Sequence, residues 1–176
     1  EVVPSDILYF VDLSATEQPL TPGHSDNSTL GYDSPAYKAV AELAAKAGKP
    51  LLNDAPDQIY NGSNGWGHGG FRSNGTAEVN YKGIVQGPYS KQSTTGIYTA
   101  NQTGASLTYT FDNLPAGEYT VMVGSYSWWA SYPRTSEVYL EYAGKSEYVD
   151  RFTLDTASYD ERRSYNFLLE QEGSLT

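Results

Sequence analysis

The stretch GSYSWWASYPR (residues 124–134) concentrates aromatic rings among small polar side chains. Tyr126, Trp128, Trp129 and Tyr132 break the alternation of the preceding residues, and Arg134 closes the stretch. Aromatic rings stack on the apolar faces of sugar rings, while a planar guanidinium donates to neighbouring hydroxyls. The pattern predicts that at least one Trp contacts a carbohydrate. In the alternative, one Trp is buried in the end of the fold and the other covers it.

A second candidate is the glycine-rich stretch IYNGSNGWGHGG (59–70). Its glycines allow positive φ and a close approach of the backbone to a partner. Tyr60, Trp66 and His68 are the bulky side chains that can contact a sugar there, although His68 also suits a structural role. Neither His-x-His nor His-Glu-x-x-His spacing occurs, which argues against a metal ion at His68.

Glycoside hydrolysis needs two facing carboxylates, one of them kept protonated by its surroundings. The acidic residues available for such a pair are Asp54, Asp57, Asp150, Asp155 and Glu161. Their spacing along the chain shows no facing pair, and DERR at 160–163 is interpreted as a solvated turn whose charges balance. We therefore expect no catalytic activity and keep a glycoside hydrolase as the third hypothesis.

Oxygen-rich loops in β-proteins often hold a structural calcium ion. Asp12, Glu17, Asp26 and Asp33 lie in irregular segments of this kind, without the spacing of an EF-hand. A structural Ca²⁺ is kept as a hypothesis, and no cofactor is expected to be required.

The net charge is −10, and no basic run occurs along the 176 residues. Nucleic acids and anionic membranes repel such a chain, so neither is an expected partner. The absence of cysteine excludes disulfides and thiolate chemistry. No apolar run approaches the length of a membrane span, so we expect no membrane insertion. Residues 1–6 are linker-like and begin with Glu, which is typical of an excised module or a processed product.

The periodicity of the chain predicts one helix and many strands. The apolar run at 7–11 suits a buried strand, and the types at 34–48 predict a capped helix. Residues 53–75 predict a long loop, and from residue 76 onward short alternating segments predict strands, the final GSLT turning into another one. The expected fold is all-β, an antiparallel β-sandwich (jelly roll) with one lateral α-helix, forming a single domain over 1–176.

Several phrases along the chain carry a family likeness. They are YFVD at 9–12, ND at 53–54, DQIY at 57–60, WG at 66–67, LTYTF at 107–111 and LPAGEYTV at 114–121, followed by Trp128 and Arg134. Through them the chain resembles the galactose-binding-like β-sandwich domains attached to secreted bacterial glycosidases, which include many carbohydrate-binding modules and malectin-like domains. The resemblance implies a noncatalytic module that binds glycan through loops at one edge of the sandwich. The helix at about 34–48 departs from the family pattern and is interpreted as an insertion.

The expected function is therefore to tether a glycoside-degrading enzyme to its glycan, outside the cell or at its surface. The expected partners are a polysaccharide and the catalytic domain of the parent protein. The residues expected to form the site are Trp66, Trp128 and Trp129 as stacking surface, with Tyr60, Tyr126, His68 and Arg134 around them. The main alternative is a structural or spacer domain, whose aromatic residues dock on a neighbouring catalytic domain.

Overall fold

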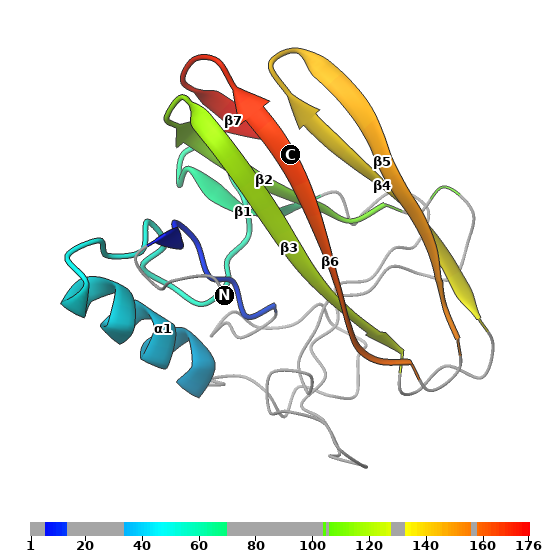
Figure 1. Cartoon of the computed structure of the whole chain (residues 1–176), viewed down its shortest axis with the longest axis horizontal. Helices are drawn as coiled ribbons and strands as arrows, with labels where there is room; N and C mark the ends of the chain where they lie inside the picture. Colours follow the sequence, from blue (N-terminus) through cyan, green and yellow to red (C-terminus); the bar gives the residue numbers. More distant parts are fainter. Residues whose placement is uncertain (1–5, 14–33, 70–103, 105, 128–132, 156–157) are drawn as a thin grey trace. The chain divides into compact units, whose positions relative to one another are not determined.

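The computed structural model describes residues 6–13, 34–69, 104, 106–127, 133–155 and 158–176 (Figure 1). The chain divides into two compact units, Glu1–Thr108 and Tyr109–Thr176. The expectation of a single domain stays a prediction. No helix among the described residues is long and apolar enough to span a membrane.

The helix of the first unit is α1 (Pro35–Lys46), and Ser34 is its N-cap residue. The hydroxyl of Ser34 accepts a hydrogen bond from the backbone N–H of Tyr37 at 3.0 Å. The same hydroxyl donates to the carboxylate of the buried Asp12. Because the cap satisfies an N–H that the first turn leaves without a partner, the helix starts here and not later.

The other end of α1 is closed by a glycine. Gly48 takes a φ of 79°, and its N–H donates to the carbonyl of Ala45 at 3.0 Å. The N–H of Lys49 reaches back to the carbonyl of Ala44, also at 3.0 Å. This pair of bonds is a Schellman motif, in which glycine takes the left-handed conformation at low cost. The helix predicted over 34–48 is confirmed.

The apolar segment at 7–11 forms no strand. The N–H of Leu52 donates to the carbonyl of Leu8 at 2.8 Å, as in a strand pair. The residue after Leu52, Asn53, contacts the backbone of Phe10 through its side chain instead. Buried Asn53 accepts from the N–H of Phe10 at 3.2 Å and donates to its carbonyl at 2.7 Å. The prediction of a buried strand at 7–11 is therefore wrong. The amide side chain of Asn53 makes the hydrogen bonds to Phe10 that the backbone of a neighbouring strand would make. The residues at 7–11 are half-buried or exposed.

A short strand, β1 (Trp66–Gly69), lies inside the stretch that was expected to be a loop. It bridges to the segment before it: the N–H of His68 donates to the carbonyl of Gln58, and the N–H of Tyr60 donates to the carbonyl of His68, both at 2.9 Å. The loop prediction over 53–75 is therefore corrected at these four residues. Glycine-rich composition concealed the strand because it carries no alternation.

The second unit consists of antiparallel strands in two sheets (Figure 1). The strands are β2 (Thr108–Leu114), β3 (Gly117–Ser127), β4 (Arg134–Tyr142), β5 (Lys145–Leu154), β6 (Ser158–Leu169) and β7 (Gly173–Leu175). One sheet contains β2, β7, β4 and β5 in that order, and the other pairs β3 with β6. Five of these six strands agree with segments predicted from alternation, and β7 agrees with the predicted final turn into a strand.

The two sheets pack face to face, and their contact forms the core of this unit. Along β6, alternate residues are buried, namely Tyr165, Phe167 and Leu169. The Phe167 ring stacks on Tyr119 of β3 at 5.1 Å between centroids and contacts Tyr142 of β4, in the other sheet, at 5.2 Å. A period of two thus gives each strand one inner face.

One predicted turn is wrong. The charged run at 160–163 lies within β6, where its residues pair with β3 from Val123 onward. The interpretation as a solvated turn followed from charge alone, but Arg163 is half-buried and contacts a carboxylate. The strands predicted between residues 76 and 100 lie outside the described residues. Over the described residues, the expectation of an antiparallel β-protein with one helix is confirmed.

Neighbouring leucines in β6 provide a test of this packing. Leu169 is almost fully buried, whereas Leu168 is 51% exposed. Leu169→Ala should lower the free energy of unfolding by about 2–5 kcal/mol, because it removes buried methyl groups and leaves a cavity. Leu168→Ala, the matched control, should change it by about 0.5 kcal/mol or less. Denaturant unfolding measures both, and equal losses would contradict the inward assignment of Leu169.

Candidate functional site

The residues predicted to bind ligand fall into two groups, one in each unit. Tyr60, Trp66 and His68 belong to the first unit, around β1. Tyr126 and Arg134 belong to the second unit, in β3 and at the start of β4. Trp128, Trp129 and Tyr132 lie outside the described residues.

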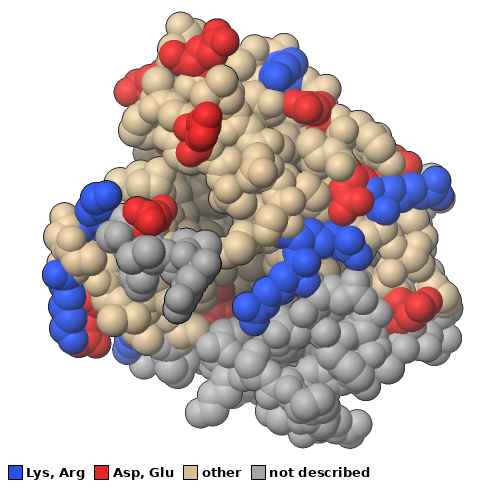
Figure 2. Space-filling model, viewed as in Figure 1, with Lys and Arg blue, Asp and Glu red and all other residues tan. Residues whose placement is uncertain are grey.

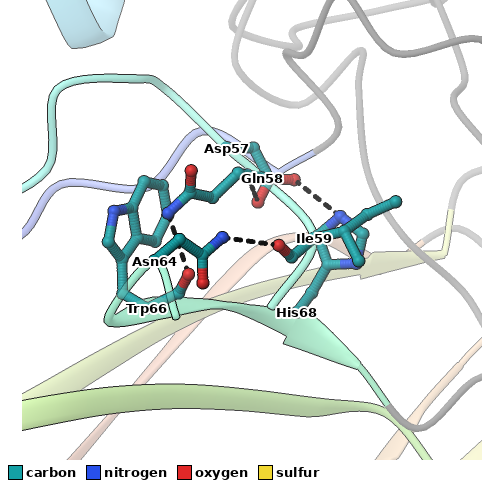
Figure 3. A network of polar contacts seen from close by, with 6 residues as sticks. All are labelled: Asp57, Gln58, Ile59, Asn64, Trp66 and His68. Carbon is teal, nitrogen blue, oxygen red and sulfur yellow. Dashed lines mark hydrogen bonds and ion pairs between the residues drawn. The ribbon is translucent and has the colours of Figure 1, made fainter. Parts of the chain in front are cut away.

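In the first group, His68 forms a buried acid–histidine pair with Asp57 (Figure 3). Nε2 of His68 lies 3.9 Å from Oδ2 of Asp57, and both side chains are fully buried. Oδ1 of Asp57 accepts from the N–H of Gln58 at 2.8 Å, and the Gln58 amide donates to the carbonyl of Trp66 at 2.9 Å. The hydrogen bond from Gln58 joins the segment before the loop to β1, beside the buried pair.

Gly67 is required where the two segments meet. Its φ is 143°, and a Cβ at this position would lie 2.6 Å from the backbone nitrogen of Tyr60 and 2.7 Å from the carbonyl oxygen of Gln58. Those atoms belong to backbone that is already hydrogen-bonded to His68. The close approach of two backbones therefore excludes any side chain here.

The loop between these segments is held by its own asparagines. Oδ1 of Asn61 accepts from the N–H groups of Ser63 at 2.8 Å and Asn64 at 3.0 Å. The amide of Asn64 donates to the carbonyl of Ile59 at 2.7 Å (Figure 3). Such Asx contacts fix a turn without a neighbouring strand. The half-buried Tyr60 precedes this turn, so it is the member of the first group that is open to a ligand.

Burial changes the role of the other two members. Trp66 is 3% exposed and its ring lies 6.1 Å from that of Tyr9, while His68 is completely buried. A sugar ring cannot lie across an indole that has almost no exposed face. The expectation that Trp66 and His68 contact sugar is therefore corrected: in the described structure they are interior residues. The sequence shows that a residue is aromatic, but it does not show whether its ring faces the interior or the solvent.

The second group lies where the chain crosses between the two sheets. Ser127 at the end of β3 pairs with Ser158 at the start of β6, and Arg134 at the start of β4 pairs with Leu154 at the end of β5. The end of β3, the start of β4, the end of β5 and the start of β6 therefore lie at the same end of the second unit (Figure 1). Arg134 is half-buried there.

Sequence reasoning missed a polar cluster between the sheets of this unit. The hydroxyl of Tyr165 donates to Oδ2 of Asp150 at 2.9 Å, and Nη1 of Arg163 lies 3.6 Å from the same oxygen. The Arg163 guanidinium also lies over the ring of Phe152, 4.3 Å from its centroid. Burial, followed by the contact with Asp150, raises the pKa of Tyr165 to about 12, although Arg163 acts in the opposite direction. Alternation within β5 and β6 was the signal that could have paired these residues.

Two of the carboxylates considered for catalysis are thus part of structural networks. Asp57 contacts His68, and Asp150 contacts Tyr165 and Arg163. Within the described part of the chain, no three His, Cys, Asp or Glu side chains gather as metal ligands. Of the residues considered for calcium, Asp12 accepts from Ser34, and the others lie outside that part. The calcium hypothesis stays a prediction.

The chain matches no protein-family model, no curated protein and no solved structure.

Gly67→Ala should destabilise the first unit, because alanine meets both an unfavourable φ and the backbone of Tyr60. The backbone strain alone costs roughly 1–3 kcal/mol, and the clash adds to it. Gly65→Ala is the matched control, because Gly65 has a φ of 77° but open space around the site of a Cβ. Thermal unfolding followed by circular dichroism should show the larger loss for Gly67→Ala. An equal loss would show that the two backbones do not meet at Gly67.

The raised pKa of Tyr165 predicts a pH dependence of stability. Because the folded state holds this proton more tightly than the unfolded chain, the stabilisation is complete below about pH 10, the ordinary value for Tyr. It should be lost as the pH rises through about 12. The free-energy difference between the parent and Tyr165→Phe should therefore shift in favour of Phe over this interval. Denaturant unfolding at a series of pH values measures it, and a difference that is constant with pH would contradict the assignment.

Proposed function

We propose that the protein is a noncatalytic carbohydrate-binding module with a jelly-roll type of β-sandwich, which holds a glycoside-degrading catalytic domain at its polysaccharide. One observation carries the proposal. β3 ends at Ser127 and β4 begins at Arg134 in the other sheet, and Trp128 and Trp129 stand between these two residues in the sequence. Connections at the ends of a rigid β-scaffold are where binding residues gather.

The surroundings of this connection suit a polyhydroxylated ligand. Arg134 opens β4 and supplies a planar donor, and Tyr126 lies at the end of β3. The connection after β5, which begins with the exposed Asp155, leaves the same end of the unit and supplies acceptors. Aromatic surface with a few donors and acceptors is the composition that sugar recognition needs. Tyr60 in the first unit is a further proposed contact.

A module of this kind acts by proximity. A weak contact with a polysaccharide becomes effective when it is linked to a catalytic domain, because the second binding event is then intramolecular. This role places the protein outside the cell or on its surface, where polysaccharides are degraded. The partners that we propose are the glycan and the catalytic domain of the parent protein.

A structural or spacer domain is the second candidate. Met122 and Leu168 are 59% and 51% exposed on the outer face of β3 and β6. Exposed apolar side chains on one face also mark surfaces for protein contact. A spacer would bind no glycan, which separates it from the first candidate. A glycoside hydrolase is third, because Asp57 and Asp150 are used in internal contacts.

Replacement of the tryptophans tests the proposal. A glycan array first identifies a bound sugar, and calorimetry with that sugar then compares the parent with Trp128→Ala and Trp129→Ala. Loss of one stacked ring should weaken binding by about 2- to 12-fold, since an aromatic stacking contact contributes roughly 0.5–1.5 kcal/mol. Met122→Ala, at an exposed site on the outer sheet face, is the control and should bind like the parent.

The array and the variants give separate answers. A folded parent that binds no glycan would overturn the proposal in favour of the spacer. Two folded Trp variants that bind as tightly as the parent would leave a carbohydrate-binding module with its site elsewhere. Release of reducing ends from a bound polysaccharide would revive the hydrolase.

A further inference from the structure

The outer face of the hairpin formed by β4 and β5 carries a ladder of paired side chains. The register places the following pairs across from one another: Thr135 and Thr153, Glu137 and Arg151, Tyr139 and Tyr148, and Glu141 and Ser146. The threonine hydroxyls lie 2.8 Å apart, and the Ser146 hydroxyl donates to Oε1 of Glu141 at 3.4 Å. An aromatic pair is thus bordered by polar pairs on both sides.

The two tyrosines at the middle of this ladder are open to solvent. Tyr139 is 50% exposed and Tyr148 is 52% exposed, although both are large aromatic side chains. Their ring centroids lie 5.5 Å apart and their planes are inclined by 65°, so the rings contact without covering each other. The Tyr139 hydroxyl donates to Oε2 of Glu137 at 3.1 Å, which fixes the direction of that side chain. Two oriented aromatic rings therefore face water from a hydrogen-bonded sheet.

The charged side chains around the tyrosines are of both signs. Glu137 faces Arg151 across the two strands, and the remaining neighbours are hydroxyl-bearing side chains or Glu141. Acidic and basic side chains also lie next to each other at the right of the view in Figure 2. The core of a protein–protein interface is depleted in charged residues, which this surface is not. A chain with a net charge of −10 also disfavours an anionic ligand. The complementary ligand is neutral, rich in hydroxyls and apolar on one face.

We propose that this outer face is a second glycan-binding surface, on which Tyr139 and Tyr148 stack against the sugar rings of a neutral polysaccharide. Glu137, Glu141 and Arg151 accept from and donate to the sugar hydroxyls. From Thr135 to Glu141 the ladder extends about 20 Å along the strand, which suits an extended chain more than a single sugar. The ligand class rests on the proposed function, but the surface uses none of the residues proposed there as sugar contacts.

Affinity gel electrophoresis of the whole chain tests the surface. Native gels contain one soluble neutral polysaccharide each, namely galactan, mannan, xylan or mixed-linkage glucan, and a gel without polysaccharide is the reference. The parent should be retarded in at least one gel. Tyr139→Thr/Tyr148→Thr should lose at least half of that retardation, because threonine keeps the strand but provides no ring. Met122→Thr/Leu168→Thr, which removes equally exposed side chains from β3 and β6, should migrate like the parent.

A fourth protein, Trp128→Ala/Trp129→Ala, makes the outcomes distinguishable. If only the Trp variant loses retardation, the second surface is overturned and the proposed function stands. If only the Tyr variant loses it, the surface is supported and the Trp site is wrong. A parent that is retarded in none of the gels overturns both. Circular dichroism checks folding, and if the double Tyr variant unfolds, Tyr139→Thr and Tyr148→Thr are tested singly with the same two outcomes.

Discussion

The pairing of β3 with β6 is the constraint on which the second unit depends. Its register runs from Gly117 opposite Leu169 to Ser125 opposite Glu161, and it decides which side chains face the other sheet. A slip by one residue would turn Phe167 and Leu169 to solvent and bring Leu168 inside together with polar neighbours. The same register fixes the ends of both strands, so the place where the chain crosses between the sheets follows from core packing and not from the connection itself.

Polar groups inside both units are held by specific partners. Asp150 is bound by Tyr165 from the opposite sheet, and Asp57 lies beside His68. Buried polar groups stabilise only when they are paired, and their geometry then fixes one arrangement of the elements that carry them. These contacts explain why chemically capable residues in this chain have structural positions. A neighbouring acid and histidine can form a catalytic or binding site only where a ligand has access to them.

The sequence allowed the helix and most strands to be predicted, because their signals are local. Ser34 and Gly48 specify the two ends of α1, and alternation specifies the inner faces of β3 to β6. The failures depend on distant partners. In the segment at 7–11, Phe10 is hydrogen-bonded to the side chain of Asn53, which is 43 residues away in the sequence. The charged run at 160–163 belongs to a strand because that strand pairs with β3. No local pattern contains that information.

Prediction of the site failed for the same reason at Trp66 and His68, since residue type says which contacts a side chain can make but not whether it is exposed. Tyr139 and Tyr148 were overlooked because each looks like an ordinary strand aromatic; only their pairing brings them together on one face. The backbone ladder of β4 and β5 sets the separation of these rings before any ligand arrives. Binding of a ligand that fits this separation costs little conformational entropy of the protein. If the proposed glycan surface is correct, a repeating chain would therefore be favoured, because many equivalent sugar rings could occupy the same pair of tyrosines in successive registers.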